Sequence, residues 1–236
     1  MDYLAFLEGR LDLIERFYNA AAEPFETTKR RIDAGEEPFV PKYAPGDFEG
    51  YEYQGEWDEA NDCLRMLGHC SLSYVSKALQ NYLCEFIAHE AKVSTDEIDK
   101  VLPRRKGGSS GSWLHRYACF LEDKTAFRWN DSPVSLAQLE EINLARNVIW
   151  HDPSIDGALP MQTEDDAKRF LKPTYGDEMY MAMRDADSVV VKDQDGNPLT
   201  LTPMTVPIEV TREKLAGAIE DVRRFCRFAE RSFSSA

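Results

Sequence analysis

Residues 136–150 have the spacing of an amphipathic helix, and an arginine stands inside its apolar side. The apolar residues cover an arc of roughly 100–140° on a helical wheel and are Leu136, Leu139, Ile142, Ile149 and Trp150. Arg146 falls near the middle of this arc, and Asn143 lies at its edge. An ionised side chain is rarely buried without a partner, because desolvation of its charge is costly. The helix therefore either faces a polar cleft or buries an arginine paired with an acid such as Glu85 or Glu90.

The rest of the chain is also predominantly helical in pattern. Apolar residues at helical spacing recur in residues 2–22, 57–92, 113–127 and 164–171, and in a final stretch that Thr211 should cap. We expect Pro24 to end the first helix and Gly68 to bend the second. Ser135 and Gln138 form a capping box at the start of the arginine-bearing helix, and Asp152-Pro153 should end it.

Two stretches interrupt the helical pattern. Residues from about 35 to 56 are rich in Gly, Pro and aromatic side chains. We expect them to pack on the body of the protein, with a stacking surface for bases as the alternative. Strand-like runs at 188–192 and 199–202 flank Asp195-Gly196-Asn197, which is typical of a β-hairpin.

The sequence thus predicts a mainly α protein, a helical bundle formed as one domain over residues 1–236. It would carry an irregular insertion at about 35–56 and a small β-hairpin at about 188–210, before the last helix. No apolar run approaches the roughly 20 residues that span a membrane, and the acidic start Met1-Asp2-Tyr3-Leu4 is unlike a signal peptide. The five cysteines form no Cys-x-x-Cys pair, which favours a reducing cytoplasm.

The charge of the chain is strongly acidic and uneven. The formal net charge is −14; residues 1–60 carry −9, whereas residues 211–236 carry +2. Nucleic acids are bound through Lys and Arg contacts to phosphate, so an acidic protein must concentrate its basic groups locally or bind something else. The plainer explanation is that the acidity provides solubility. One local concentration is Arg104, Arg105 and Lys106, which either contact a phosphate backbone or belong to a solvated connector.

The segment Arg146-Asn147-Val148-Ile149-Trp150-His151 resembles the Arg-polar-x-x-x-His signature of the HEPN superfamily. This group of helical-bundle proteins includes many metal-independent ribonucleases. The resemblance extends from about residue 57 to the C-terminus, with long helices on either side of the motif. It implies a HEPN-like bundle without a cofactor, and a homodimer in which two copies of the motif line one cleft. It also implies settings such as toxin–antitoxin pairs, with an antitoxin as the protein partner, or phage defence.

The motif residues suit cleavage of RNA without a metal ion. Histidine titrates near neutral pH and can act as base or acid, and arginine matches the phosphate oxygens. By the resemblance, Arg146 would stabilise the phosphorane, Asn147 would orient His151 or the phosphate, and two His151 would share the acid and base roles. Trp150 departs from the family pattern, because its bulk directly before His151 is large enough to crowd a substrate.

Other functions are less well supported by the sequence. Glu85 and His89 share a helix face, but no second Glu-x-x-His completes a di-iron site, so no metal is expected. The chain has no dinucleotide-binding or P-loop motif and no Gly-x-Ser-x-Gly nucleophile elbow. The alternative to the ribonuclease is a non-catalytic helical module that binds another protein.

Overall fold

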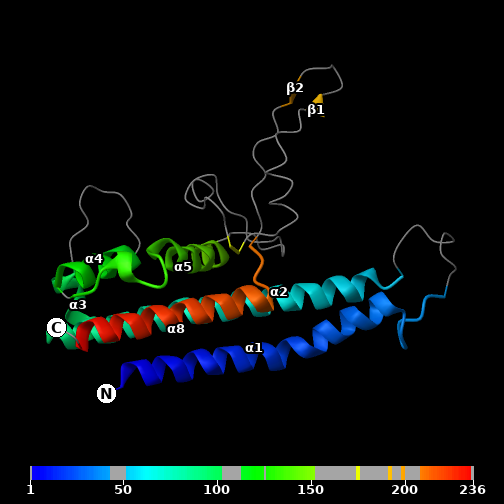
Figure 1. Cartoon of the computed structure of the whole chain (residues 1–236). Helices are drawn as coiled ribbons and strands as arrows, with labels where there is room; N and C mark the ends of the chain where they lie inside the picture. Colours follow the sequence, from blue (N-terminus) through cyan, green and yellow to red (C-terminus); the bar gives the residue numbers. More distant parts are fainter. Residues whose placement is uncertain are drawn as a thin grey trace.

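The computed structural model describes most of the chain, and this part is mainly helical (Figure 1). The described residues are 2–42, 52–102, 113–124, 126–151, 174–175, 191–192, 198–199 and 208–234. The mainly α class predicted from the sequence is confirmed. The predicted helix at 164–171 lies outside the described residues.

Helix α2 (Gln54–Ala91) lies at the centre of the fold. It packs against α1 (Tyr3–Ala34), α3 (Ile98–Val101), α4 (Trp113–Lys124), α5 (Leu136–His151) and α8 (Arg212–Ser234). In Figure 1, α8 runs between the α1–α2 pair below it and α4 and α5 above it. Short 3-10 turns, Thr95–Glu97 and Trp129–Asp131, precede α3 and α5.

The core forms where α2, α5 and α8 meet. Side chains with no more than 1 % of their surface exposed include Leu72, Leu83, Ile87, Leu139, Ile142, Ile219, Val222 and Phe225. Phe225 stacks on Trp129 with ring centroids 5.4 Å apart. The core position of Phe225, Val222 and Ile219 confirms the apolar face predicted for the last helix. None of the helices in the described ranges combines the length and apolar character needed to cross a lipid bilayer.

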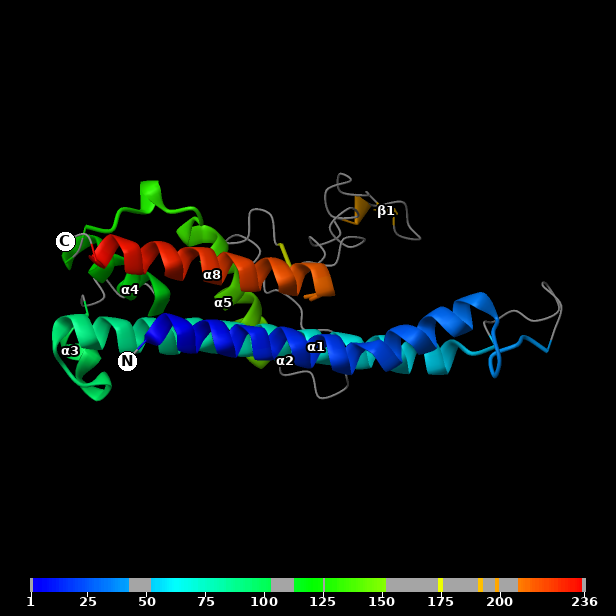
Figure 2. The same ribbon diagram turned by 60° about the horizontal axis from the view of Figure 1, so that its bottom comes forward.

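Pro24 lies inside α1 and does not end it, so the predicted stop is wrong. A proline removes the hydrogen bond to the carbonyl four residues earlier, which here belongs to Ala20. Both Pro24 and Ala20 are exposed, so water can satisfy that carbonyl. Figure 2 shows the C-terminal part of α1 bending out of line with its first part, as expected of a proline within a helix.

Gly68 marks a close approach of two backbones. A Cβ at this position would overlap the carbonyl oxygen of Val210, which belongs to the segment that leads into α8. Glycine is therefore required for α2 to pack this closely against residues 208–210. The sequence singled out this residue as a bend, and the structure assigns it a packing role instead.

The caps predicted for the starts of α5 and α8 are confirmed. The Ser135 hydroxyl accepts from the Gln138 backbone N–H at 3.2 Å, and the Gln138 side chain accepts from the Ser135 N–H at 2.9 Å. This reciprocal pair confirms the capping box of α5. Thr211 caps α8, because its hydroxyl accepts from the Lys214 N–H at 3.3 Å. These local side chain–backbone bonds depend on short spacing, which a sequence displays directly.

Acidic side chains on one side of the first helix pair with arginines of the last helix. Arg227 of α8 contacts Glu8 of α1 at 2.6 Å, and Arg223 binds both Asp12 and Glu15. Further along, the Arg212–Glu26 pair repeats this contact at 2.7 Å. The uneven charge of the chain is thus partly neutralised within the fold.

The two irregular regions are described only at their edges. Next to the insertion, the rings of Phe39 and Tyr53 meet edge to face at 5.4 Å, and the Tyr53 hydroxyl donates to the Val40 carbonyl. Residues 43–51 lie outside the described part of the chain. Strands β1 (Val191–Lys192) and β2 (Pro198–Leu199) pair antiparallel. The remaining residues of the hairpin predicted at about 188–210 lie outside it, apart from 208–210.

Candidate active site

Arg146 is a half-buried cation held by neutral groups. Its guanidinium donates to the Asn147 side-chain oxygen at 2.9 Å and lies over the Trp150 ring, 5.9 Å from the ring centroid. Both contacts lie within α5, because Asn147 is one residue and Trp150 four residues after Arg146 on this helix. Within the described ranges, Arg146 forms no ion pair with a carboxylate. A positive charge held in this way is available to an external anion.

Neither of the acids named as possible partners of Arg146 is bonded to it. Glu90 contacts His89 at 3.2 Å, and Glu85 lines a groove between α1 and α2. Of the two alternatives for this helix, the arginine paired with Glu85 or Glu90 is therefore wrong. His89 also packs against the Tyr3 ring, 5.8 Å between centroids. In the part of the chain described here, no three His, Cys, Asp or Glu side chains gather closely enough to hold a metal ion.

Trp150 is anchored on α2. Its indole N–H donates to the Ser73 hydroxyl at 3.0 Å, and the Ser73 hydroxyl in turn donates to the His69 carbonyl at 2.8 Å. The anchored indole keeps 65 % of its surface exposed. Its position is therefore fixed, and it presents a flat aromatic surface beside Arg146.

His69 connects the same part of α2 to the start of α8. Its Nε2 donates to the Ile208 carbonyl at 2.9 Å. Burial lowers the pKa of His69, and this effect outweighs the opposing hydrogen bond to the backbone. The histidine is therefore neutral at physiological pH and has a structural role. Neither His69 nor Ser73 belongs to a recognisable motif, so the sequence carries no signal for these contacts.

The other predicted site residues are only partly visible. His151 is the last residue of α5, which places its backbone one turn beyond Asn147. The side chain of His151 lies outside the described residues, as do Arg104, Arg105 and Lys106. Asn143 is buried, and its side-chain oxygen accepts from the Trp113 indole at 2.9 Å, so it links α5 to α4.

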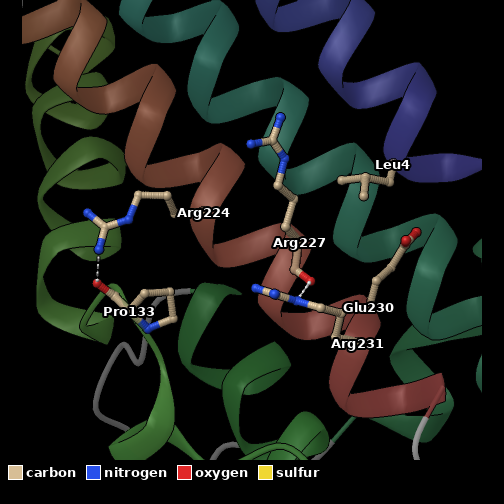
Figure 3. Close-up of a pocket in the computed structure, with 6 residues that line it drawn as sticks. All are labelled: Leu4, Pro133, Arg224, Arg227, Glu230 and Arg231. Carbon is tan, nitrogen blue, oxygen red and sulfur yellow. Dashed lines mark hydrogen bonds between the residues drawn. The ribbon is translucent and has the colours of Figure 1, made fainter.

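A second feature is a basic groove beside α8 (Figure 3). The cavity measures 610 Å³ and is lined by Leu4, Pro133, Arg224, Arg227, Glu230 and Arg231. Figure 3 shows the Arg224 side chain reaching toward Pro133, whose carbonyl it binds at 3.1 Å. Arg231 donates to the Arg227 carbonyl at 3.2 Å. Burial raises the pKa of Glu230, the one acidic residue that lines the groove. The groove thus brings three arginines together on an acidic protein, of which Arg227 is paired with Glu8.

Comparison with known proteins adds no relative. No family, no curated protein and no solved structure matches this chain. The function has to be inferred from the site itself.

Proposed function

We propose that this chain, as one HEPN-like domain, is a metal-independent endoribonuclease. The observation that carries the proposal is the environment of Arg146, whose half-buried guanidinium is bonded to the Asn147 amide and the Trp150 ring. An arginine that served stability alone would be expected to pair with a carboxylate, as Arg223 does with Glu15. Neutral partners leave the charge free to bind a phosphate, which suits a guanidinium.

The reaction would proceed by attack of the 2′-hydroxyl on the neighbouring phosphorus. His151 would take the proton from the 2′-oxygen while that oxygen forms its bond to phosphorus. Arg146 would stabilise the negative charge of the phosphorane, and His151 of the partner subunit would protonate the leaving 5′-oxygen. The P–O5′ bond breaks, and the products are a 2′,3′-cyclic phosphate and a 5′-hydroxyl. Asn147 would hold the guanidinium in place through the hydrogen bond already present.

The surface around Arg146 supports a cleft formed with a second copy. Trp150 is 65 % exposed, and Met66 is 66 % exposed on the same face of α2 as Ser73. Large apolar side chains that stay exposed beside a polar centre are typical of an interaction surface. We place the protein in the cytoplasm, in a toxin–antitoxin or phage-defence setting with an antitoxin or another protein as partner.

Single-stranded RNA would reach the site along basic and aromatic side chains. The exposed indole of Trp150 offers a stacking surface for a base next to Arg146. Arg224 and Arg231 of the groove in Figure 3 would contact phosphates further along the strand. We assign the same role to Arg104, Arg105 and Lys106.

The test is RNA cleavage in the presence of EDTA. We expect the wild-type protein to cleave RNA and leave a 2′,3′-cyclic phosphate. Arg146→Ala should lower the rate by about 100- to 1000-fold, the usual effect of losing one charge stabiliser. Arg146→Lys should restore it only in part, because lysine lacks the planar fork. His151→Ala should lower the cleavage rate by about 100- to 10,000-fold, because it removes the general acid and base. Arg16→Ala, at an exposed position on α1, serves as the control.

Each other outcome would overturn the proposal. An Arg146→Ala protein that folds and cleaves RNA at the wild-type rate removes the central role of Arg146. Cleavage that stops on addition of EDTA assigns the chemistry to a metal. A wild-type protein that cleaves no RNA leaves the second candidate, a non-catalytic interaction module.

That second candidate is favoured by a different observation. Phe6, Leu13 and Phe17 of α1 are at least half exposed, although they are large and apolar. Such side chains are expected at a protein–protein contact. If the protein is an interaction module, the Arg146→Ala variant should bind the partner as tightly as the wild-type protein does.

A further inference from the structure

The exposed apolar residues of α1 form one stripe. Phe6 is 73 % exposed, Leu13 50 % and Phe17 52 %. On a helical wheel the three side chains fall within about 40° of one another, so they point in one direction along about three turns. A helix that belongs only to its own fold would place polar residues on this side.

A second stripe on α2 faces the same way. Tyr74, Ala78, Asn81 and Glu85 fall within about 60° on α2, and Tyr74 is 61 % exposed. Ala78, Asn81 and Glu85 line a groove of 380 Å³ together with Phe6 and Arg10 of α1. The Phe6 end of the first stripe and the Glu85 end of the second therefore meet at one groove.

The exposed apolar side chains continue beyond this cavity. Helices α1 and α2 lie side by side in Figures 1 and 2. Lys29 bonds to Asn61, and Tyr3 meets His89, so the two helices run antiparallel. This register places Phe17 at the level of Tyr74. The exposed stripe on α1 thus runs from Phe6, at the cavity, to Phe17, beside Tyr74.

The groove carries one charge of each sign. Arg10 lies on the α1 wall and Glu85 on the α2 wall, and both are exposed. In the described part of the molecule neither side chain forms an ion pair. A surface that offers an apolar stripe with an unpaired cation on one wall and an unpaired anion on the other is complementary to itself.

We propose that a second copy of this chain occupies the groove between α1 and α2. A two-fold axis along the groove would lay α1 of each copy on α2 of the other. Arg10 would then meet Glu85 of the partner subunit twice, once on each side of the axis, and Phe17 would pack on Tyr74 of the partner subunit. The result is a four-helix bundle made from two helical hairpins.

This contact is separate from the proposed catalytic cleft. Trp150 is anchored at Ser73, and Ser73 points about 100° around α2 from Tyr74. The α1–α2 groove and the surface around Arg146 therefore lie on different faces, and the two contacts can coexist. The inference does not depend on the nuclease, and Arg10 and Glu85 have no part in the proposed chemistry.

Charge exchange between two variants tests the proposal. In Arg10→Glu, position 10 of each copy would place a glutamate opposite Glu85 of the partner subunit, so the interface would hold two pairs of like charge. Glu85→Arg would have the same effect with two pairs of arginines. Each variant alone should weaken this contact about 100-fold, since the symmetry repeats the repulsion. The mass measured by light scattering should fall to half the wild-type value. An equimolar mixture of the two variants should regain the wild-type mass, because positions 10 and 85 of opposite copies then carry opposite charges again on both sides of the axis.

The controls separate this surface from folding and from RNA cleavage. Arg30→Glu, an equal change of charge elsewhere on α1, should keep the wild-type mass, and circular dichroism should be the same for all variants. Cleavage of RNA by Arg10→Glu should equal that of the wild type if the nuclease proposal holds. The groove proposal is overturned if the two single variants keep the wild-type mass, or if their mixture fails to regain it. Both results can be read whether or not the protein cleaves RNA.

Discussion

The indole N–H of Trp150 donates to the hydroxyl of Ser73 at 3.0 Å and fixes the end of α5 to the middle of α2. The bond reaches across 77 residues of sequence and involves an exposed tryptophan. It keeps the indole beside Arg146, where it supports the guanidinium from one side.

Ser73→Ala should lower the free energy of unfolding by about 1 kcal/mol, the usual worth of one hydrogen bond. Trp150→Phe should cost a similar amount, because it removes the same donor. The double variant should lose less than the sum of the two, which urea unfolding can measure as a double-mutant cycle. Ser73→Thr keeps the hydroxyl and serves as the control. Strictly additive losses would show that the bond contributes nothing.

Gly68→Ala should destabilise the protein by about 1–3 kcal/mol, because the new Cβ meets the Val210 carbonyl and the backbones must move apart. Gly217→Ala is the matched control in α8. Nothing lies within 4 Å of a Cβ at that position, so alanine should stabilise the helix by up to about 1 kcal/mol. Thermal unfolding of the two variants should therefore shift in opposite directions.

His69 should make stability depend on pH. Because burial lowers its pKa in the folded state, the unfolded chain takes up a proton first as the pH falls below about 6.5. Stability is then lost between that value and the lower folded pKa, by at most about 1.4 kcal/mol per pH unit. His69→Gln can keep the bond to Ile208 and does not titrate. Urea unfolding at pH 7.5 and 5.5 should show a larger loss for the wild type than for His69→Gln.

Arg223→Met should cost about 1–3 kcal/mol, since this mostly buried guanidinium binds both Asp12 and Glu15 and its loss leaves two acids facing each other. The neighbouring Arg224→Met is the control, because Arg224 is 48 % exposed and its nearest carboxylate is 4.0 Å away. Added salt should reduce the difference in unfolding free energy between wild type and Arg223→Met. An equal cost for the two variants would contradict the ion-pair explanation.

Local signals in the sequence predicted local structure well. Ser135, Gln138 and Thr211 cap the helices that their spacing indicated. The helix end predicted at Pro24 is wrong. The free-energy cost of a proline inside a helix depends on whether the unpaired carbonyl reaches water, and only the tertiary structure shows that.

Contacts between distant segments could not be read from the sequence. The helical wheel marks Arg146 as unusual and predicts either a polar cleft or an acidic partner on another helix. Its partners proved to be neighbours on its own helix, Asn147 and Trp150. The role of Ser73 depends on the packing of α2 against α5, and no spacing rule encodes it.

The ion pair between Arg223 and Asp12 joins residues 211 positions apart. While the chain is being synthesised, α1 can form a hairpin with α2 early, but its acidic side has no basic partner until α8 leaves the ribosome. The nascent hairpin therefore carries its negative charges facing water for most of translation. Mutual repulsion between such hairpins on neighbouring ribosomes would delay their premature association until the last helix arrives.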